Sequence, residues 1–351
     1  MYVFLSYDHY EINVTKDRAK ALQCLDLQQD PIPVQRSLGV YWDIHSDTFT
    51  YKVDLQDKPF TRRGILSTVN SLYDPLGFVA PVIIEGKSIL QQLTLTTKAG
   101  EMDANCIGWD DQLPNQFKDR WKLWRDELSD LENLHVNRCY LPQGLSMARR
   151  IELHSFSDAS TKAIGQATYI RTIDKQGTPY VSFVLGKAKV APTAVTSIPR
   201  LELCAAVMAT QAVQKITSEL DVVVDQTYYY TDSKVVLGYI QNKSRRFYVY
   251  VANRVQQIHS VSKPQQWHYI ATEINPADIA SRGISAKEIS SSSWFQGPKF
   301  LYFPNVSPID SDEKFTVEDS DPDVRPFISV HHTTTGKPHG IGTHRFQRFS
   351  S

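Results

Sequence analysis

The sequence predicts an α/β fold, a mixed five-stranded sheet with flanking helices, preceded by a mostly helical region. Two observations carry this prediction. Beyond residue 150, β-rich runs and helical stretches follow the order βββαβααβα, which combines hairpins with crossover connections. Before residue 142, apolar residues recur mostly at the spacing of amphipathic helices. The chain therefore divides into an N-terminal helical part and a C-terminal sheet.

Length and charge set the first limits on function. The 351 residues are too many for one ordinary core and suit two or three domains. Acidic and basic residues balance at 38 each, which argues against a histone-like, wholly basic nucleic-acid binder. Local basic surfaces are still allowed, because electrostatic steering depends on where the charges lie.

The four cysteines are far apart, and none forms a Cys-x-x-Cys pair. This spacing argues against a disulfide framework or a zinc ribbon and favours free thiols in a reducing compartment. The N-terminus lacks the basic and long apolar regions of a signal peptide, and no stretch approaches the roughly 18 apolar residues of a membrane span. We therefore expect a soluble protein of the cytoplasm or nucleus, with no membrane partner.

The N-terminal region contains one predicted hairpin and several predicted helices. β-rich runs at 38–43 and 48–53 flank a polar turn and predict the hairpin. Apolar residues at helical spacing predict the helices, and the segment Asp74-Pro75-Leu76-Gly77 ends one of them. Residues 138–142 are expected to be a linker. The expected helices lie at 17–25, at 65–73, from Pro81 onward and at 117–131.

The C-terminal half alternates strands and helices, with a hairpin turn at Gly177. Beyond about residue 304 the periodic pattern ends and an acidic segment, then a Gly- and Thr-rich one, follows, so we predict a disordered tail over 304–351. Strands are expected at 151–157, 164–173, 180–185, 227–232 and 267–271. Helices are expected at 199–220, 233–240, 247–259 and 275–281.

Four acidic residues occupy positions that packing alone rarely explains. Asp158 ends the first strand of the sheet and Asp232 ends the fourth, while Glu202 lies one turn into a long helix. Asp278 opens the last predicted helix. Strand ends at one edge of an α/β sheet converge on a crevice where ligands bind. With the first and fourth strands parallel and adjacent, Asp158 and Asp232 would be neighbours.

Four carboxylates in one crevice repel one another unless cations neutralise them. Oxygen ligands without His or Cys select Mg²⁺ or Mn²⁺. Two such ions, about 3.5–4 Å apart, activate a water and stabilise the leaving oxygen of a phosphodiester. The pattern therefore indicates catalytic carboxylates that bind two Mg²⁺ (or Mn²⁺) ions.

Each acidic residue taken alone also has a structural interpretation. Asp158 and Asp232 suit helix N-caps, because their side chains can accept hydrogen bonds from free backbone N–H groups. Glu202 and Asp278 suit the first turn of a helix, where a negative charge is favourable. The occurrence of all four in this order, on these elements, favours the metal site over four separate structural roles.

The segments around the carboxylates, SFSDAS, IPRLELCAA, YYTDSKVVLGYI and NPADIASRG, resemble the four acidic motifs of retroelement ribonuclease H. Together with TRRGILSTVNSLYDPLGFVAP, LGVYWD and GWDDQLP, they closely resemble BEL/Pao-type retrotransposon polyproteins. The resemblance covers about residues 20–303. It implies that residues 1–142 are the C-terminal, thumb- and connection-like end of a reverse transcriptase and that residues 143–303 form a ribonuclease H-like domain.

The resemblance also implies an activity, Mg²⁺-dependent cleavage of the RNA strand of RNA–DNA hybrids by an endonuclease. The Tyr-x-Asp-Asp hairpin of the polymerase is absent, so we expect no polymerase activity. In a full-length element, the reverse transcriptase palm would lie upstream and an integrase region downstream. Many ribonucleases H carry a mobile His shortly before the last Asp, whereas His268 lies within a strand here, and Thr272 or Glu273 is expected in that loop instead.

A hybrid is recognised through its phosphates and 2′-hydroxyls rather than its bases. Small residues near Asp158, among them Gly165, would let a backbone approach closely. Basic residues near Glu202 and Asp232 in sequence are candidates for phosphate contacts, although a basic run is usually a solvated face. These candidates are Lys187, Lys189, Arg200, Lys234, Arg245 and Arg246.

Two other functions remain open at this point. A catalytically inactive, retroelement-derived fragment would bind nucleic acid without cutting it. A DNA strand-transferase shares the fold but is expected to carry its triad in the order Asp, Asp, Glu, whereas the Glu comes second here. The order of the carboxylates therefore favours ribonuclease H over the strand-transferase.

Overall fold

The computed structural model describes residues 35–37, 40–96, 108–141, 145, 148–194, 196–304, 315–318 and 320–326. The helix expected at 17–25 lies outside these residues. Within them, Cys139 and Cys204 carry free thiols, as the cysteine spacing predicted. In this described part, every helix is too short or too polar to cross a lipid bilayer.

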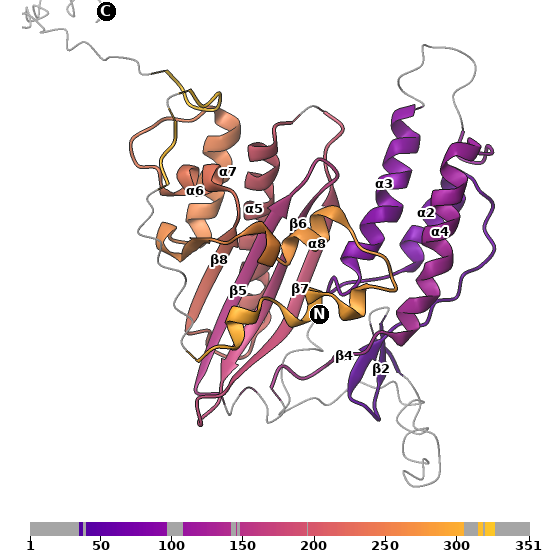
Figure 1. The fold of residues 1–351 in the computed structure, drawn as a ribbon, viewed down its shortest axis with the longest axis horizontal. Coiled ribbons are helices and arrows are strands. Elements are labelled where there is room, and N and C mark those ends of the chain that lie inside the picture. The colour runs from indigo at the N-terminus through magenta and orange to yellow at the C-terminus, as the bar shows by residue number, and fades with distance from the viewer. Residues whose placement is uncertain are drawn as a thin grey trace, which may run out of the picture.

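The larger sheet has five strands in the order β7-β6-β5-β8-β9 (Figure 1). The first three in sequence pair antiparallel through two hairpins, whereas β8 lies parallel to β5 and β9 lies parallel to β8. The predicted mixed five-stranded sheet is confirmed. The strands are β5 (Arg150–Ala159), β6 (Ala163–Ile173), β7 (Pro179–Val190), β8 (Gln226–Thr231) and β9 (Trp267–Tyr269).

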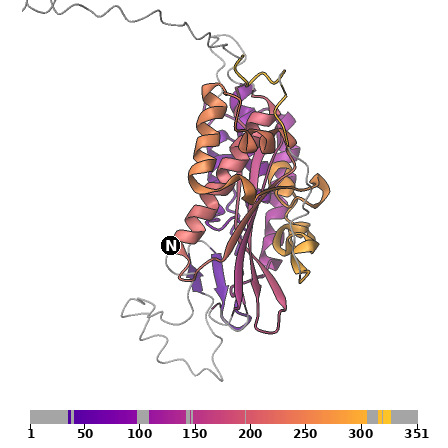
Figure 2. The same ribbon diagram turned by 90° about the vertical axis from the view of Figure 1, so that its left-hand side faces the viewer.

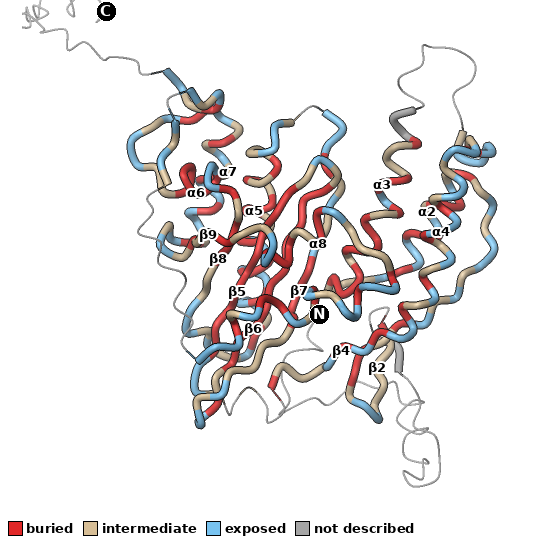
Figure 3. The backbone as a smooth tube through the Cα atoms, in the orientation of Figure 1, coloured by how far each residue is buried: buried red, intermediate tan, exposed pale blue. Residues whose placement is uncertain are grey.

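Helices cover both faces of this sheet (Figure 2). Neighbouring residues of a strand point to opposite faces, so Tyr229 packs in one core and Tyr230 packs with Phe156 in the other. Apart from Arg150, every residue of the central strand β5 is buried (Figure 3). One face carries α5 (Ile198–Glu219), α6 (Lys234–Gln241) and α7 (Val249–Val261), and the other carries α8 (Ala277–Arg282) and α9 (Ser293–Gln296).

The described residues of the N-terminal part combine a small antiparallel sheet with the α-helices α2, α3 and α4 (Figure 1). The helix expected at 117–131 ends at Glu127 and continues as a 3₁₀ helix to Asn133. The linker expected at 138–142 starts with Arg138, whose side chain is fixed by an ion pair with Asp47 at 2.6 Å. The elements are β1 (Gln35–Ser37), β2 (Val40–Asp43), β3 (Thr48–Thr50), α2 (Arg62–Ser71), α3 (Ala80–Thr96), α4 (Lys118–Glu127) and β4 (Val136–Asn137).

This N-terminal part covers the edge of the larger sheet at β7. The Gly186 backbone N–H donates to the Leu76 carbonyl at 2.9 Å, so the edge strand has a partner. Gly77 has a φ of +76° and lies so close that a Cβ there would meet the Gly186 carbonyl oxygen at 1.9 Å. The fully buried Trp294 donates from Nε1 to the Phe78 carbonyl at 2.9 Å. The contact at the edge of β7 and the hydrogen bond of the Trp294 indole together fix the N-terminal part against the sheet.

Part of the predicted disordered tail lies against the sheet domain. Val324 forms an antiparallel bridge with Phe247. Asp323 is buried and accepts hydrogen bonds from Arg200. The expectation of disorder therefore does not hold for residues 320–326, because an ion pair and a backbone bridge give this acidic stretch partners that its composition does not reveal.

One hydrophobic core includes residues from both sides of the division predicted at residue 142, so loss of Trp294 should destabilise the two parts together. Trp294→Ala leaves a large cavity, and we expect the free energy of unfolding to fall by about 3–5 kcal/mol. Urea unfolding, followed by circular dichroism and by tryptophan fluorescence, measures the change.

Trp109→Ala provides the control, because the Trp109 side chain is 48% exposed and its loss should cost under about 1 kcal/mol. For the wild type, the two probes should report a single shared transition. Two separate transitions would mean that the parts fold independently despite their contact.

Candidate active site

The parallel pair β5–β8 places two of the predicted carboxylates at one edge of the sheet. Ser157 of β5 lies opposite Thr231 of β8 in the register. An aspartate follows each of these residues: Asp158 comes after Ser157, and Asp232 comes after Thr231. The sequence-based expectation that these two residues are neighbours is therefore consistent with the strand pairing.

Asp158 is buried within β5 and does not cap a helix. The chain turns after Ala159 into β6, and Asp158 lies opposite Gly165 in the antiparallel pair. Its Oδ2 accepts a short hydrogen bond from the Ser281 hydroxyl. Burial, followed by the negative charges of Asp232 and Asp278, raises the pKa of Asp158 to about 6, against the opposing effect of that hydrogen bond. The alternative of a helix N-cap is wrong for Asp158.

Asp232 follows β8 directly and is not the N-cap of α6 either. That position belongs to Ser233, whose side chain accepts from the Val236 backbone N–H at 3.2 Å. One carboxylate oxygen of Asp232 accepts from the Thr272 hydroxyl at 2.7 Å. The other, Oδ1, is buried and has no hydrogen-bond partner in the described structure. A buried acceptor without a partner is unfavourable, so this oxygen needs an explanation other than capping.

Glu202 reaches the same edge from α5. It accepts a short hydrogen bond from the Ser233 hydroxyl, which connects it to the residue after Asp232. Burial, followed by the charges of Asp232 and Asp158, raises the pKa of Glu202 to about 7, although the Ser233 hydrogen bond opposes the shift. Glu202 therefore belongs to the same electrostatic cluster as the two strand-end aspartates.

Asp278 joins the cluster from α8, at its margin. Its side chain is 26% exposed and forms an ion pair with Arg282 at 2.6 Å. Burial and the charge of Asp232 raise the pKa of Asp278, while Arg282 opposes the shift. The helix expected to be the last is followed by α9, so Asp278 does not open the final helix of the chain.

Helix α8 lies directly on the sheet beside Asp158. A Cβ on Gly165 would meet the Ala277 carbonyl oxygen at 2.8 Å and the Ser281 backbone N at 2.9 Å. The small residues near Asp158 thus admit a backbone, as expected, and at Gly165 that backbone is the chain's own helix. This close approach is what brings the Ser281 hydroxyl to Asp158.

Three hydroxyl groups bind the carboxylates: Ser281 to Asp158, Ser233 to Glu202 and Thr272 to Asp232. Thr272 was expected in this loop. The other two were not singled out from the sequence, although Ser233 adjoins Asp232 and Ser281 lies one helical turn after Asp278. Adjacency to a motif was the signal that could have identified them.

The donor set suits a hard divalent cation, because it offers only oxygen atoms. Such an ion would give the Asp232 Oδ1 atom a partner. It would also favour the ionised forms of Asp158 and Glu202, whose pKa values are raised by burial and then by neighbouring negative charges. In the conformation described, no three His, Cys, Asp or Glu side chains are grouped so that they could hold a metal ion together. The four carboxylates therefore suit a metal ion by their chemistry. In this structure their partners are three hydroxyl groups and Arg282.

The basic candidates are distributed over several elements. Lys187 and Lys189 are exposed on β7. Lys234 opens α6, where its ammonium lies 5.2 Å from the centre of the Tyr269 ring. Arg246 is exposed beside the C-terminal segment, whose Arg325 N–H donates to the Arg246 carbonyl at 2.7 Å.

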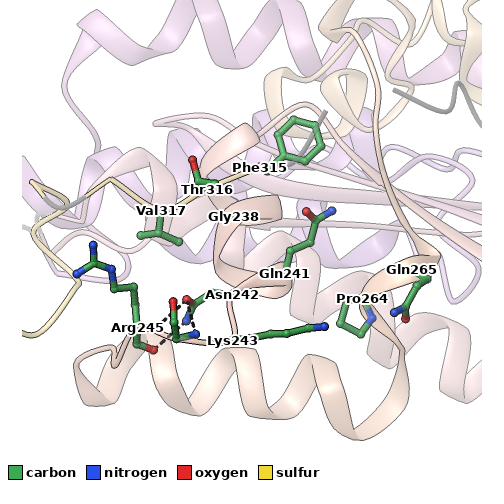
Figure 4. Close-up of a pocket in the computed structure, with 11 residues that line it drawn as sticks. Gly238, Gln241, Asn242, Lys243, Arg245, Pro264, Gln265, Phe315, Thr316 and Val317 are labelled. Carbon is green, nitrogen blue, oxygen red and sulfur yellow. Dashed lines mark hydrogen bonds between the residues drawn. The ribbon is translucent and has the colours of Figure 1, made fainter. Parts of the chain in front are cut away.

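Two further candidates are engaged away from the carboxylates. Arg200 binds Asp323 through contacts of 2.6–3.1 Å. Arg245 lines a cavity of about 590 Å³ beside α6, where Lys243 also lies and Phe315 closes one side (Figure 4). None of the four carboxylates lines this cavity. Arg245 therefore lies beside a cavity that is separate from the carboxylates, and its role as a phosphate contact stays a prediction.

Comparison with solved structures finds ribonucleases H at low similarity. LC11-RNase H1 from compost, solved in complex with an RNA/DNA hybrid, is 13% identical, with 37% of this chain and 91% of that chain covered and a TM-score of 0.24. RNase H1 from the halophilic archaeon Halobacterium salinarum is 9% identical, with 41% and 99% covered and a TM-score of 0.25. The N-terminal RNase H domain of a Mycobacterium tuberculosis protein is 8% identical, with 41% and 99% covered and a TM-score of 0.26. A search of curated proteins gives no match.

A family match spans the division between the helical part and the sheet. The sequence model of the family described as "Pao retrotransposon-like RNaseH-like domain" matches residues 61–233. This span includes Asp158, Glu202 and Asp232, and it ends before Asp278. It also includes α2, α3 and α4 of the N-terminal part. Residues 61–233 therefore match the Pao retrotransposon-like RNaseH-like domain family, in agreement with the predicted resemblance to BEL/Pao elements.

Proposed function

We propose that this chain is an endonuclease of the ribonuclease H type that cleaves the RNA strand of RNA–DNA hybrids, with Asp158, Glu202, Asp232 and Asp278 as ligands for two Mg²⁺ or Mn²⁺ ions. The observation that carries the proposal is the parallel pairing of β5 with β8, which sets Asp158 and Asp232 at one edge, where burial and then the charge of Asp232 raise the pKa values of Asp158, Glu202 and Asp278. The family match supports the same class of enzyme.

The residues of the chain would hold and orient the acceptor oxygens. The hydroxyls of Ser281 and Ser233 fix one oxygen each of Asp158 and Glu202. Thr272 fixes one oxygen of Asp232 and leaves Oδ1 available. When bound, the divalent ions would supply an activated water and stabilise the leaving 3′ oxygen.

The hybrid would be held mainly by phosphate contacts. Lys187 and Lys189 on β7, Lys234 at the start of α6 and the exposed Arg246 are candidates for these contacts. Arg200 is a weaker candidate, because its guanidinium already binds the carboxylate of Asp323.

A catalytically inactive, nucleic-acid-binding fragment is the second candidate. One observation favours it: Asp278 already has an ion-pair partner in Arg282 at 2.6 Å, and a hydroxyl donates to one oxygen of each of the other three carboxylates. Binding of hybrid without cleavage, in every divalent metal tested, would select this alternative.

Three predictions test the proposed function, and the first concerns the substrate. The full chain with Mg²⁺ or Mn²⁺ should cleave the RNA strand of a labelled RNA–DNA hybrid and leave duplex DNA intact, because 2′-hydroxyls and groove width identify the RNA strand. Gel analysis of both strands measures the products. Cleavage that continues in excess EDTA would contradict a metal-dependent site.

The second prediction separates a metal ligand from a structural residue. Asp232→Asn removes one negative charge at nearly constant shape and leaves Ser233 as the cap of α6. In EDTA the variant should melt at the wild-type temperature or above. With Mg²⁺ only the wild type should gain stability, because only its folded state binds the ion tightly, and the variant should lose cleavage.

Asp225→Ala is the matched control for Asp232→Asn. Asp225 precedes the same strand and accepts from the Ile151 backbone N–H at 2.8 Å, a structural contact. Its loss should lower the melting temperature equally with and without Mg²⁺. If Asp232→Asn shows this same metal-independent loss and keeps activity, Asp232 has a structural role.

The third prediction follows from the pKa of Glu202, which is raised to about 7. An unfolded Glu titrates near 4.3, so the folded state holds the proton to higher pH than the unfolded chain does. The resulting stabilisation is fully present below about pH 4 and is lost as the pH rises through about 7.

In EDTA, Glu202→Gln should therefore gain stability relative to wild type between about pH 5 and about pH 8, by an amount on the order of 1–3 kcal/mol. Urea unfolding at each pH measures the difference. Glu219→Gln, at the other end of α5 where Glu219 pairs with Lys215, should show no such rise. A pH-independent difference for Glu202→Gln would remove Glu202 from the cluster.

A further inference from the structure

Helix α8 carries two groups of the candidate site, Asp278 and Ser281, yet it has only six residues (Ala277–Arg282). So short a helix is not stable by itself in water. Its position must therefore come from contacts with the rest of the chain. Those contacts lie at its two ends and beneath it.

The N-terminal end of α8 is held by the sheet. The side chain of Asn275 donates from Nδ2 to the Ser157 carbonyl at 3.1 Å and accepts from the Ala277 backbone N–H at 3.1 Å. Ser157 adjoins Asp158 in β5, so this end of the helix is tied directly to the strand that carries the first carboxylate. Gly165 provides the close contact beneath the helix.

The C-terminal end of α8 is held by the N-terminal part of the chain. Lys162, in the turn between β5 and β6, donates from Nζ to the Arg282 carbonyl at 2.8 Å and forms an ion pair with Glu85 of α3. The helix ends at Arg282 with Gly283 as its C-cap, and the next backbone N–H, that of Ile284, donates to the Pro81 carbonyl of α3 at 3.2 Å. Helix α3, which runs alongside the sheet in Figure 1, thus supports both Lys162 and the end of α8.

Glu85 is itself fixed between two cations. Arg120 of α4 forms an ion pair with it and also donates to the Gln92 side chain at 2.8 Å. Burial raises the pKa of Glu85, but the hydrogen bonds and charges of Lys162 and Arg120 outweigh burial and hold the pKa below its usual value. Glu85 stays ionised and keeps its hold on Lys162. A cationic donor at the carbonyl end of a helix is also favourable for the helix dipole.

We propose that Lys162, held by Glu85, is a positioning residue for the candidate active site. It fixes the C-terminal end of α8 and so keeps Ser281 against Asp158 and Asp278 beside Asp232. The inference rests on the proposed function for its catalytic consequence. It assigns the helical N-terminal part a role in building the site as well as covering the sheet.

The test uses the full chain and Lys162→Met, which keeps the length of the side chain and removes its donor and charge. Hydrogen exchange read by mass spectrometry should show amides of residues 277–284 exchanging about tenfold faster, with β5 unchanged. With hybrid and Mg²⁺, kcat should fall by about 10–100-fold and KM should change little, because a small displacement of a reacting group is costly. Lys162→Arg should restore both values.

Lys287→Met is the matched control. Lys287 pairs with Glu127 across the same two parts of the chain at 3.8 Å, and its side chain is 62% exposed. Its loss should change neither exchange in 277–284 nor kcat. Unchanged exchange in Lys162→Met, or faster exchange with kcat unaltered, would overturn the inference. Absence of cleavage by the wild type would overturn the proposed function alone, since faster exchange in Lys162→Met would still support the placement of α8.

Discussion

The concentration of negative charge at the β5–β8 edge is the constraint on which the rest of the site depends. Two unit charges 4 Å apart repel by about 4 kcal/mol at an effective dielectric constant near 20, before motion and water reduce the effect. The raised pKa values of Asp158 and Glu202 express this repulsion together with burial. Three hydroxyls and one arginine offset part of it. The remaining excess of negative charge, with one carboxylate oxygen lacking a partner, is what a divalent cation would relieve.

The sheet also depends on its contacts with the helical N-terminal part of the chain. The strand β7 would be an open edge without the Leu76 carbonyl that pairs with it, and Trp294 would lose its hydrogen-bond partner without Phe78. The same helices hold Lys162 through Glu85. The family match over residues 61–233 spans this junction as well. The helical N-terminal part and the ribonuclease H-like sheet thus pack together through a shared core, and the first supports the edge of the second.

The C-terminal segment changes how the basic surface is interpreted. Asp323 is 1% exposed and binds Arg200, so the charge of this arginine is already compensated within the chain. The guanidinium also lies 5.0 Å from the centre of the Tyr250 ring. Arg200 therefore contributes to packing between α5, α7 and the C-terminal segment. Lys187 and Lys189 of β7, by contrast, are exposed, which is what the proposed phosphate contacts require.

The sequence by itself determined the mixed five-stranded sheet and the elements that carry the four carboxylates, because periodicity and motif order are written along the chain. It also offered Thr272 or Glu273 for the loop before Asp278, and the Thr272 hydroxyl is the one that binds Asp232. Only the tertiary structure decided what holds these groups: Ser281 reaches Asp158 from 123 positions away, and Ser233, not Asp232, caps α6. The physical reason is that hydrogen bonds and ion pairs between residues distant in sequence leave no periodic trace. The contact of Lys162 with Glu85 and the Arg282 carbonyl exists only once two hairpin strands and two helices have packed.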